Sequence, residues 1–318
     1  MPDSTRRVAG LRGIFGYFTQ RVFCMAKKMF DVKTAILFNG GTWKEFHLEA
    51  LGLKAKAFLL LNPFDEGFSR EFYAYGFREP LNTLAIFRTV EKTKPVVLDI
   101  GSNLGYFPIV ELKAGAKYVI GVEPVPSSFA LLSRTLRDYR NVTVSNIAIS
   151  DKHENLTLYV SNKRNVTSSS MSLLAHTGHR IVDEISVRAA PLLAFARQHP
   201  INMVRMDVEG HEYTILKGKI PDQIVTICIE LHILHPYSKI NAVRLLQHLN
   251  RQGFQASIAI NEIKLDHYPV VKYLGLKRAY KLVTALEENG PSIQQNVSLA
   301  ELLKEIPEIG QMHLILQR

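Results

Sequence analysis

The sequence contains little cysteine. Its 318 residues include two, Cys24 and Cys228, which lie far apart, so neither a disulfide framework nor a cysteine-ligated zinc site is available. Charged residues make up 21% of the chain, and 19 glycines and 14 prolines are too few for a collagen-like or disordered composition. With 47% hydrophobic residues, the chain is expected to be globular, with two domains or one large α/β domain with additions.

Long hydrophobic runs are also missing. The longest uncharged stretch near the N-terminus, residues 13–20 (GIFGYFTQ), is too short to span a membrane and weak as the core of a signal peptide. We therefore expect a cytoplasmic protein without an export or membrane-spanning segment. Four Asn-x-Ser/Thr triplets are attributed to chance; they begin at Asn141, Asn155, Asn165 and Asn296.

Positive charge exceeds negative charge, with 39 Lys+Arg against 29 Asp+Glu and a formal net charge of +10. Two segments carry most of the excess: residues 1–33 have a net charge of +5 and residues 264–281 of +4. Residues 8–30 also show the apolar spacing of an amphipathic helix, which either packs on the main domain or lies on an anionic membrane. We predict that the two basic segments form a docking surface for the inner face of a membrane or for a lipid-linked glycan.

Between residues 95 and 260, short β-branched runs alternate with helix-like segments. The runs are VVLDI, YVIGVEP, VTVSNIAI, INMVRMD and VTICIELH, and helices are expected at 126–138, 210–218 and 238–251. This alternation predicts an α/β fold, in which helices cover both faces of a mostly parallel sheet. Further strands are expected at 156–160 and 184–190, and the terminal QMHLILQR is expected to close one edge of the sheet.

Residues 1–94 lack this alternation. They contain a strand-like AFLLL at 57–61 and a helical pattern from Pro80 to about Lys92. We therefore divide the chain into an N-terminal extension with a basic helix and a cap region, residues 1–94, and an α/β domain, residues 95–318, with an insertion at about 261–310. Two segments either close over the functional pocket and touch the acceptor or are plain connectors: Gly76, Arg78 and Glu79, and the serine-rich loop 167–172.

A glycine-rich loop follows the first strand of the α/β domain. In VVLDIGSNLGYF (96–107), Asp99 near the strand end is followed by Gly101, Asn103 and Gly105, and a helix begins near Leu104. Glycines let a ligand approach the backbone closely, and a helix start presents free N–H groups. The spacing DxGxxxG differs from the GxGxxG of dinucleotide sites and the GxxxxGK[ST] of phosphate loops. It suits S-adenosylmethionine, whose ammonium group needs a nearby carboxylate.

The next strand supports the same cofactor. YVIGVEP ends in Glu123, 22 residues after Gly101, and an acidic side chain at such a strand tip can accept hydrogen bonds from both ribose hydroxyls. A carboxylate there would repel a 2′-phosphate. Together the loop and the acid predict a nucleoside-type pocket at the carboxyl ends of the strands.

Four segments, DIGSNLGYF, VEP, NVTVSNIAISD and MDVEGHEYTILKG, resemble the FkbM family of S-adenosylmethionine-dependent methyltransferases over about residues 70–235. A weaker similarity lies in HLILQR. The resemblance implies the Rossmann-like class I methyltransferase sheet of seven strands, the last of them antiparallel. It also implies O-methylation, mostly of sugar or natural-product hydroxyls, and no required metal.

By position, the resemblance implies a set of cofactor-binding residues. Asp99, Gly101, Asn103 and Gly105 would line the methionine end, Glu123 would bind the ribose, and Asn146 with Ala148 would form the adenine edge. Ser102 stands where the family usually has alanine. The complete predicted cofactor site is Asp99, Gly101, Ser102, Asn103, Gly105, Tyr106, Glu123, Pro124, Asn146 and Ala148.

Transfer of a methyl group to a hydroxyl needs a base near neutral pKa, typically a histidine or a carboxylate. Five candidates follow two adjacent core strands: Asp207, Glu209, His211, Glu230 and His232. Because residues two apart on a strand share a face, Glu230 and His232 are expected to face one crevice. These donors would also suit Mg²⁺, Mn²⁺ or zinc, but HEYTI is not HExxH. We predict no catalytic metal.

Two other functions remain open. The basic charge suggests an RNA methyltransferase, although DVEG stands in place of an [DN]PP[FY] motif and the sequence has no RNP or KH signature. Nucleic acid is therefore not the expected partner. The second alternative is a membrane-associated scaffold that binds the cofactor without catalysis. The function we predict is O-methylation of a hydroxyl on a sugar, a glycolipid or a small metabolite.

Overall fold

The computed structural model describes residues 41–53, 55–62, 68–161, 169–170, 181–261 and 292–318. The helices are the 3₁₀-helix η1 (Leu48–Leu51), α2 (Phe68–Tyr75), α3 (Pro80–Thr93), α4 (Tyr106–Ala114), α5 (Pro126–Leu136), α6 (Leu192–Gln198), α7 (Glu212–Leu216), α8 (Pro236–Arg251) and α11 (Leu299–Glu305). The strands are β1 (Thr42–Glu45), β2 (Phe58–Leu61), β3 (Val96–Ile100), β4 (Tyr118–Val122), β5 (Val142–Ser145), β6 (Ala148–Ser150), β7 (Glu154–Ser161), β8 (Ser169–Ser170), β9 (Ile181–Pro191), β10 (Met203–Met206), β11 (Thr226–Ile233), β12 (Gln255–Asn261), β13 (Ser292–Val297) and β14 (Gly310–Gln317).

The described part of the chain is built around an eight-stranded sheet with the order β13-β12-β14-β11-β10-β3-β4-β5. Strands β5, β4, β3, β10 and β11 pair in parallel, and β14 is antiparallel to both β11 and β12. The predicted mostly parallel α/β sheet with an antiparallel last strand is therefore confirmed. The expected count of seven strands is exceeded by β13, which pairs with β12 at the edge of the sheet.

The position predicted for the terminal strand was wrong. QMHLILQR forms β14, but this strand lies between β11 and β12 and not at an edge. Residues 312–316 of β14 are all buried, on both faces of the strand. A strand that is apolar on both faces belongs inside a sheet, where two neighbouring strands also satisfy its backbone groups.

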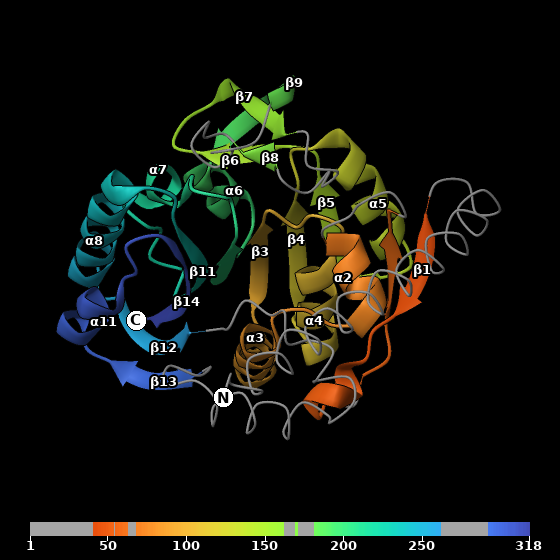
Figure 1. Cartoon of the computed structure of the whole chain (residues 1–318), viewed down its shortest axis with the longest axis horizontal. Coiled ribbons are helices and arrows are strands. Elements are labelled where there is room, and N and C mark those ends of the chain that lie inside the picture. Colours follow the sequence, from red (N-terminus) through yellow and green to blue (C-terminus); the bar gives the residue numbers. More distant parts are fainter. Residues whose placement is uncertain (1–40, 54, 63–67, 162–168, 171–180, 262–291) are drawn as a thin grey trace, which may run out of the picture.

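Helices cover the sheet on both sides, in two hydrophobic clusters (Figure 1). Side chains of α3, α4 and α5 pack with Val97 and Val119, whereas those of α6, α7, α8 and α11 pack with Leu98 and Ile120. The alternation of Val97 and Leu98 between the two clusters follows from the two-residue period of a strand. The β-branched runs in the sequence therefore become strands buried on both faces.

A smaller sheet with the order β6-β9-β7-β8 lies beside the main one. The predicted strands at 156–160 and 184–190 form β7 and β9, which pair antiparallel along most of their length. Val125, Leu158 and Val187 belong to its own small hydrophobic cluster.

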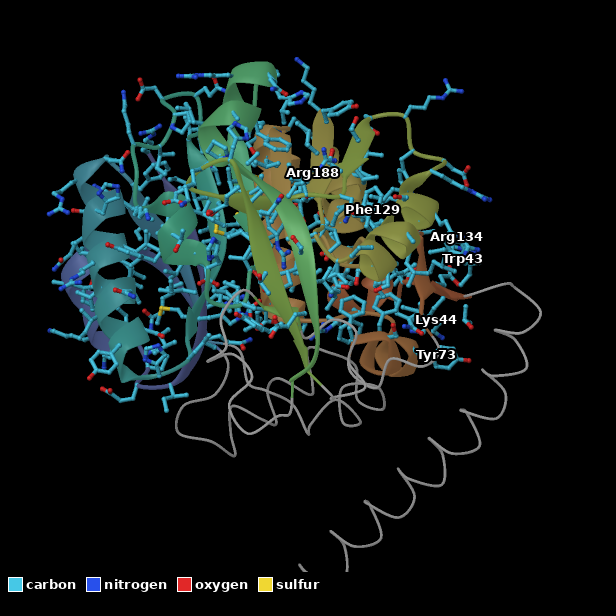
Figure 2. The ribbon with its side chains drawn as sticks, turned by 90° about the horizontal axis from the view of Figure 1, so that it is seen from above. Trp43, Lys44, Tyr73, Phe129, Arg134 and Arg188 are labelled. Carbon is cyan, nitrogen blue, oxygen red and sulfur yellow. The ribbon has the colours of Figure 1, made fainter. Side chains whose placement is uncertain are left out.

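The part of the chain before β3 packs on the α4 and α5 side. Strands β1 and β2 pair antiparallel, and the Leu60 N–H donates to Thr135 Oγ1 of α5 over 3.4 Å. Trp43, Lys44, Tyr73 and Arg134 lie along one flank of the molecule in Figure 2, and Lys44 Nζ is 5.1 Å from the centre of the Tyr73 ring. The expected strand at 57–61 and helix at Pro80–Lys92 are confirmed by β2 and α3.

Several predictions concern residues outside the described ranges. These are the basic helix at 8–30, the basic segment 264–281 and most of the loop 167–172. Of the helices in the described ranges, none has the length and apolar character needed to cross a membrane.

Candidate active site

The glycine loop connects β3 to α4 at the carboxyl end of the parallel strands. Gly101, Asn103 and Gly105 have positive φ angles of 80°, 50° and 100°. A Cβ added to Gly101 would lie 1.9 Å from the carbonyl oxygen of Asp207. We expected this glycine to admit a ligand, but the space is filled by the backbone that follows β10. Gly101 therefore allows the loop and the Asp207 segment to touch.

Glu123, directly after β4, lies against this loop. Its Oε2 accepts from the Asn103 N–H and its Oε1 from the Val125 N–H, both over 2.9 Å. Burial raises the pKa of Glu123 to about 7, although both backbone N–H groups favour the charged form. The Asn146 amide nitrogen donates over 2.9 Å to the carbonyl oxygens of Glu123 and Pro124, so Asn146 fixes the turn that carries the acid.

Asp99 is placed differently from the prediction. Its side chain is fully buried, and its Oδ1 accepts from Ser102 Oγ over 2.7 Å and lies 3.8 Å from Arg205 Nη1. Burial raises the pKa of Asp99 despite the opposing effect of Arg205. The carboxylate has no exposed surface, and its Oδ2 has no hydrogen-bond partner among the described residues. Asp99 and Ser102 thus form a buried hydrogen bond within the loop that stabilises its conformation.

Tyr106 and Ala148 are also buried. Tyr106 is 2% exposed; its hydroxyl lies 2.8 Å from Thr83 Oγ1 and accepts from the Arg78 N–H over 3.1 Å. Its ring stacks on Phe46 with centroids 5.2 Å apart. Ala148 is 2% exposed and packs in the core of the small sheet. Both were predicted at the cofactor site because of their place in the sequence, whereas tertiary packing turns them inward.

Arg205 links the glycine loop to the segment after β10, and the sequence reasoning missed it. Its Nη1 donates to the Gly101 carbonyl oxygen over 3.2 Å, and its Nη2 donates to Asp207 Oδ2 over 3.1 Å. The residue is 4% exposed, and its guanidinium carbon lies 4.1 Å from the centre of the Phe107 ring. The signal was a lone arginine inside the apolar run INMVRM, because an arginine is almost never buried unless it is paired.

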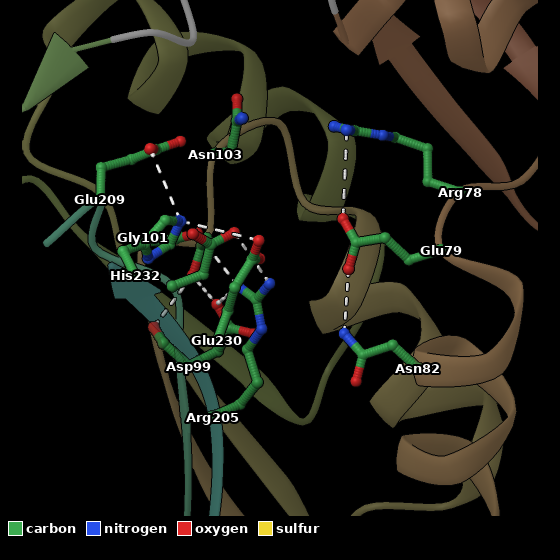
Figure 3. Close-up of polar contacts among 12 residues, drawn as sticks. Arg78, Glu79, Asn82, Asp99, Gly101, Asn103, Arg205, Glu209, Glu230 and His232 are labelled. Atoms are coloured by element: carbon green, nitrogen blue, oxygen red, sulfur yellow. Dashed lines mark hydrogen bonds and ion pairs between the residues drawn. The ribbon is translucent and has the colours of Figure 1, made fainter. Parts of the chain in front are cut away.

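His232 lies at the centre of a group of carboxylates at the ends of β10 and β11 (Figure 3). Its Nδ1 is 2.6 Å from Glu212 Oε1, and Glu212 also accepts from the Gly210 N–H over 3.0 Å. Its Nε2 is 3.6 Å from both Glu209 Oε2 and Glu230 Oε1. The shared face expected for Glu230 and His232 is observed. Glu212, which we had not selected, orients the imidazole.

Burial and neighbouring charges together shift the pKa values of His232, Glu230 and Asp207. Burial alone would lower the pKa of His232, but Glu212, Glu230 and Glu209 outweigh it and raise the pKa well above its usual range. Burial, followed by repulsion from Asp207 and Glu79, raises the pKa of Glu230 well above its usual range. Burial would raise the pKa of Asp207 as well, but the positive charges around it, that of Arg205 first, together outweigh burial and lower the pKa. The charged form of Asp207 is therefore favoured at this site.

Two of the five predicted catalytic residues have different surroundings from the rest. Glu209 is about half exposed and has a positive φ of 52°, so its carboxylate reaches His232 from an unusual backbone conformation. His211 Nε2 lies 3.2 Å from Ser150 Oγ of β6, and burial lowers its pKa. The structure therefore brings Asp207, Glu209, Glu230 and His232 together, while His211 contacts the small sheet.

Donor groups suitable for a cation occur in two sets in the described part of the chain. Asp207, Glu209 and His232 form one, and Glu79, Glu230 and His313 form the other; in each, one atom per residue lies within 4.8 Å of the others. The second set contains His313, which the sequence reasoning did not select.

Taken together, the parallel sheet, the glycine loop after its first strand and the acid after its second define the α/β architecture of a class I methyltransferase. Residues 99–256 match the family model described as Methyltransferase FkbM domain. This segment therefore belongs to the FkbM methyltransferase family, and the resemblance seen in the sequence is confirmed. No curated protein is significantly similar in sequence to the chain.

Solved structures with similar architecture are distant in sequence. An O-methyltransferase from Bacillus cereus in complex with SAH is 11% identical; the match covers 78% of this chain and 86% of that one, with a TM-score of 0.33. Precorrin 8w decarboxylase from Methanobacterium thermoautotrophicum is 14% identical over 82% and 96%, with a TM-score of 0.39. Ribosomal protein L11 methylase from Lactobacillus delbrueckii subsp. bulgaricus is 10% identical over 74% and 77%, with a TM-score of 0.34.

Proposed function

We propose that this methyltransferase uses S-adenosylmethionine and methylates a hydroxyl oxygen of a sugar, a glycolipid or a small metabolite. The observation that carries the proposal is the contact between His232 Nδ1 and Glu212 at 2.6 Å. It leaves Nε2 facing the carboxylates at the strand ends, where a hydroxyl proton can be taken up. A histidine oriented by a buried carboxylate is a recurrent arrangement for a general base.

The residues near the glycine loop fit the cofactor. Asn103 Oδ1 is buried and has no hydrogen-bond partner among the described residues, so it is available to a donor group of a bound molecule. Glu123 lies directly against the Asn103 backbone, where we expect it to accept from the ribose hydroxyls. Asn146 would hold the turn after Glu123 in place. The cofactor supplies a methyl group bound to a positively charged sulfur atom.

The remaining steps belong to residues of the chain. The bound cofactor would supply the methyl carbon, and its sulfur would leave as a neutral thioether when the acceptor oxygen takes that carbon. His232 Nε2, neutral above the raised pKa of this histidine, would accept the hydroxyl proton, and Glu212 would stabilise the resulting imidazolium. Arg205 holds Asp207 next to the glycine loop. This contact would keep the distance between the His232 base and the methyl donor constant. Much of the acceleration would come from this positioning.

The acceptor can be identified by incubating the protein with radiolabelled S-adenosylmethionine and fractionated cell extract. We expect label in a hydroxyl-bearing lipid, glycan or small-molecule fraction. His232→Gln should abolish labelling while calorimetry shows unchanged cofactor affinity, and the exposed His153→Gln serves as the matched control. Label that enters RNA, or labelling that survives His232→Gln, would contradict the proposal.

The membrane docking surface stays a prediction, because residues 1–33 and 264–281 lie outside the described ranges. Deletion of residues 1–30 should abolish sedimentation with anionic vesicles.

A further inference from the structure

Three donor side chains from separate elements meet beside the proposed base. Glu79 precedes α3, Glu230 belongs to β11 and His313 to β14, and one donor atom of each lies within 4.8 Å of the others. Glu230 also borders the base, since its Oε1 is 3.6 Å from His232 Nε2. Glu79 and His313 have no part in the proton transfer described above.

The fold holds this group rigidly. Glu230 and His313 are directly opposite each other in the antiparallel pair of β11 and β14, so their side chains project from the same face at the spacing of a cross-strand pair. Glu79 Oε2 accepts from Asn82 Nδ2 over 2.9 Å, and its Oε1 is 4.0 Å from Arg78 Nη2. Figure 3 shows Glu79 placed across from Glu230 by these contacts. The donors are thus positioned before any ligand binds.

His313 lacks the hydrogen bond that a buried imidazole needs. The residue is 3% exposed, and its Nδ1 is buried without a partner among the described residues. Such a group costs free energy unless a ligand or water satisfies the ring.

We propose that Glu79, Glu230 and His313 bind a divalent first-row cation, with Mn²⁺ as the representative ion. Two carboxylates and one imidazole form a mixed oxygen and nitrogen donor set that suits Mn²⁺ and Zn²⁺. Carboxylate oxygens and imidazole nitrogens bind Zn²⁺ at about 2.0–2.2 Å. The charge of a bound cation would offset the repulsion between Glu79 and Glu230, and its remaining positions would be open to water or to an acceptor oxygen.

The neighbouring set, Asp207, Glu209 and His232, is less suited to a cation. Asp207 is already paired with Arg205 at 3.1 Å. In the set with His313, the Nδ1 of the imidazole has no hydrogen-bond partner among the described residues.

The proposal is tested on the full chain, treated with chelator and titrated with MnCl₂ while the free ion is followed by electron paramagnetic resonance. We expect one tightly bound Mn²⁺ per chain, with nitrogen hyperfine coupling from the imidazole in pulsed measurements. His313→Gln should remove the coupling, and both His313→Gln and Glu79→Gln should weaken binding by at least about tenfold. Controls are His153→Gln and Glu91→Gln, which change an exposed histidine and an exposed glutamate on α3.

Two results would overturn the proposal. The first is the absence of stoichiometric Mn²⁺ binding, or equal binding by wild type and Glu79→Gln. The second is loss of binding in Asp207→Asn with retention in His313→Gln, which would place the cation in the neighbouring set. Circular dichroism of each variant, recorded without metal, checks that it folds. If His313→Gln does not fold, the result for Glu79→Gln decides, because Glu79 is partly exposed and its substitution perturbs the core less. Binding is measured without methyl transfer, so it does not depend on the proposed function.

Discussion

Arg205 Nη2 lies 3.1 Å from Asp207 Oδ2, although the two residues are separated by a single position in the chain. The same guanidinium donates to the Gly101 carbonyl oxygen over 3.2 Å. One side chain therefore joins the carboxyl ends of β3 and β10, the two strands that carry the glycine loop and the first catalytic candidate. Removal of the Arg205 side chain should therefore disturb both the glycine loop and Asp207.

Arg205→Met is expected to destabilise the protein by about 3–5 kcal/mol, because it leaves the buried Asp99 and the partly buried Asp207 without their counter-charge. Chemical denaturation measures the difference. Arg205→Lys should recover part of the loss, since it restores the charge without the forked geometry. Equal stability of Arg205→Met and wild type would show that the bridge contributes nothing.

Gly101→Ala should cost about 2–5 kcal/mol of stability, from the positive φ and from the overlap of the new Cβ with the Asp207 carbonyl. Gly218→Ala is the matched control, because a Cβ there meets nothing within 4 Å. Thermal unfolding of the two variants gives the comparison. A stable Gly101→Ala protein would mean that the loop and the Asp207 segment can separate without cost.

Glu212→Gln should reduce kcat by about 10²–10⁴-fold, since the imidazolium of His232 loses its partner. Glu212 raises the pKa of His232, so the variant should also have a lower pKa at this histidine. As a base, His232 acts only above its pKa, and the rising limb of the pH–kcat profile should therefore move to lower pH. An unmoved limb would exclude this role, and Glu305→Gln, at an exposed position of α11, should leave both quantities unchanged.

Tyr106→Phe should destabilise the protein by about 1–3 kcal/mol, because the Arg78 N–H and Thr83 lose their common partner. Cofactor affinity, measured by calorimetry, should remain near the wild-type value. A marked loss of affinity at unchanged stability would instead support the prediction made from the sequence, in which Tyr106 contacts the cofactor.

Glu123 should make stability depend on pH. Its pKa in the folded protein is about 7, against a usual value of 4.5, so the folded state binds the proton more tightly than the unfolded state. This contribution is present below about pH 4.5 and is lost as the pH rises through about 7. Wild type should therefore lose stability relative to Glu123→Gln across that interval in urea unfolding. A constant difference would show an ordinary pKa, and Glu91→Gln controls for a change of net charge.

The sequence by itself determined the sheet, the glycine loop and the acid after β4. These features are local: β-branched runs, the DxGxxxG spacing and an acidic strand end follow from neighbouring residues, and parallel pairing then places all strand ends at one edge. The shared face of Glu230 and His232 also needed no tertiary information, because a two-residue period fixes it.

Only the tertiary structure decided which side chains face the crevice. Asp99, Tyr106 and Ala148 were predicted at the cofactor site by position, but packing across the sheet and against Phe46 buries them. The roles of Arg205 and Glu212 follow from their contacts with Gly101, Asp207 and His232 in the folded protein. His313 meets Glu230 because β14 inserts between β11 and β12, a pairing of residues 83 positions apart. Contacts at such separation depend on how the whole sheet assembles, and no local pattern in the sequence specifies them.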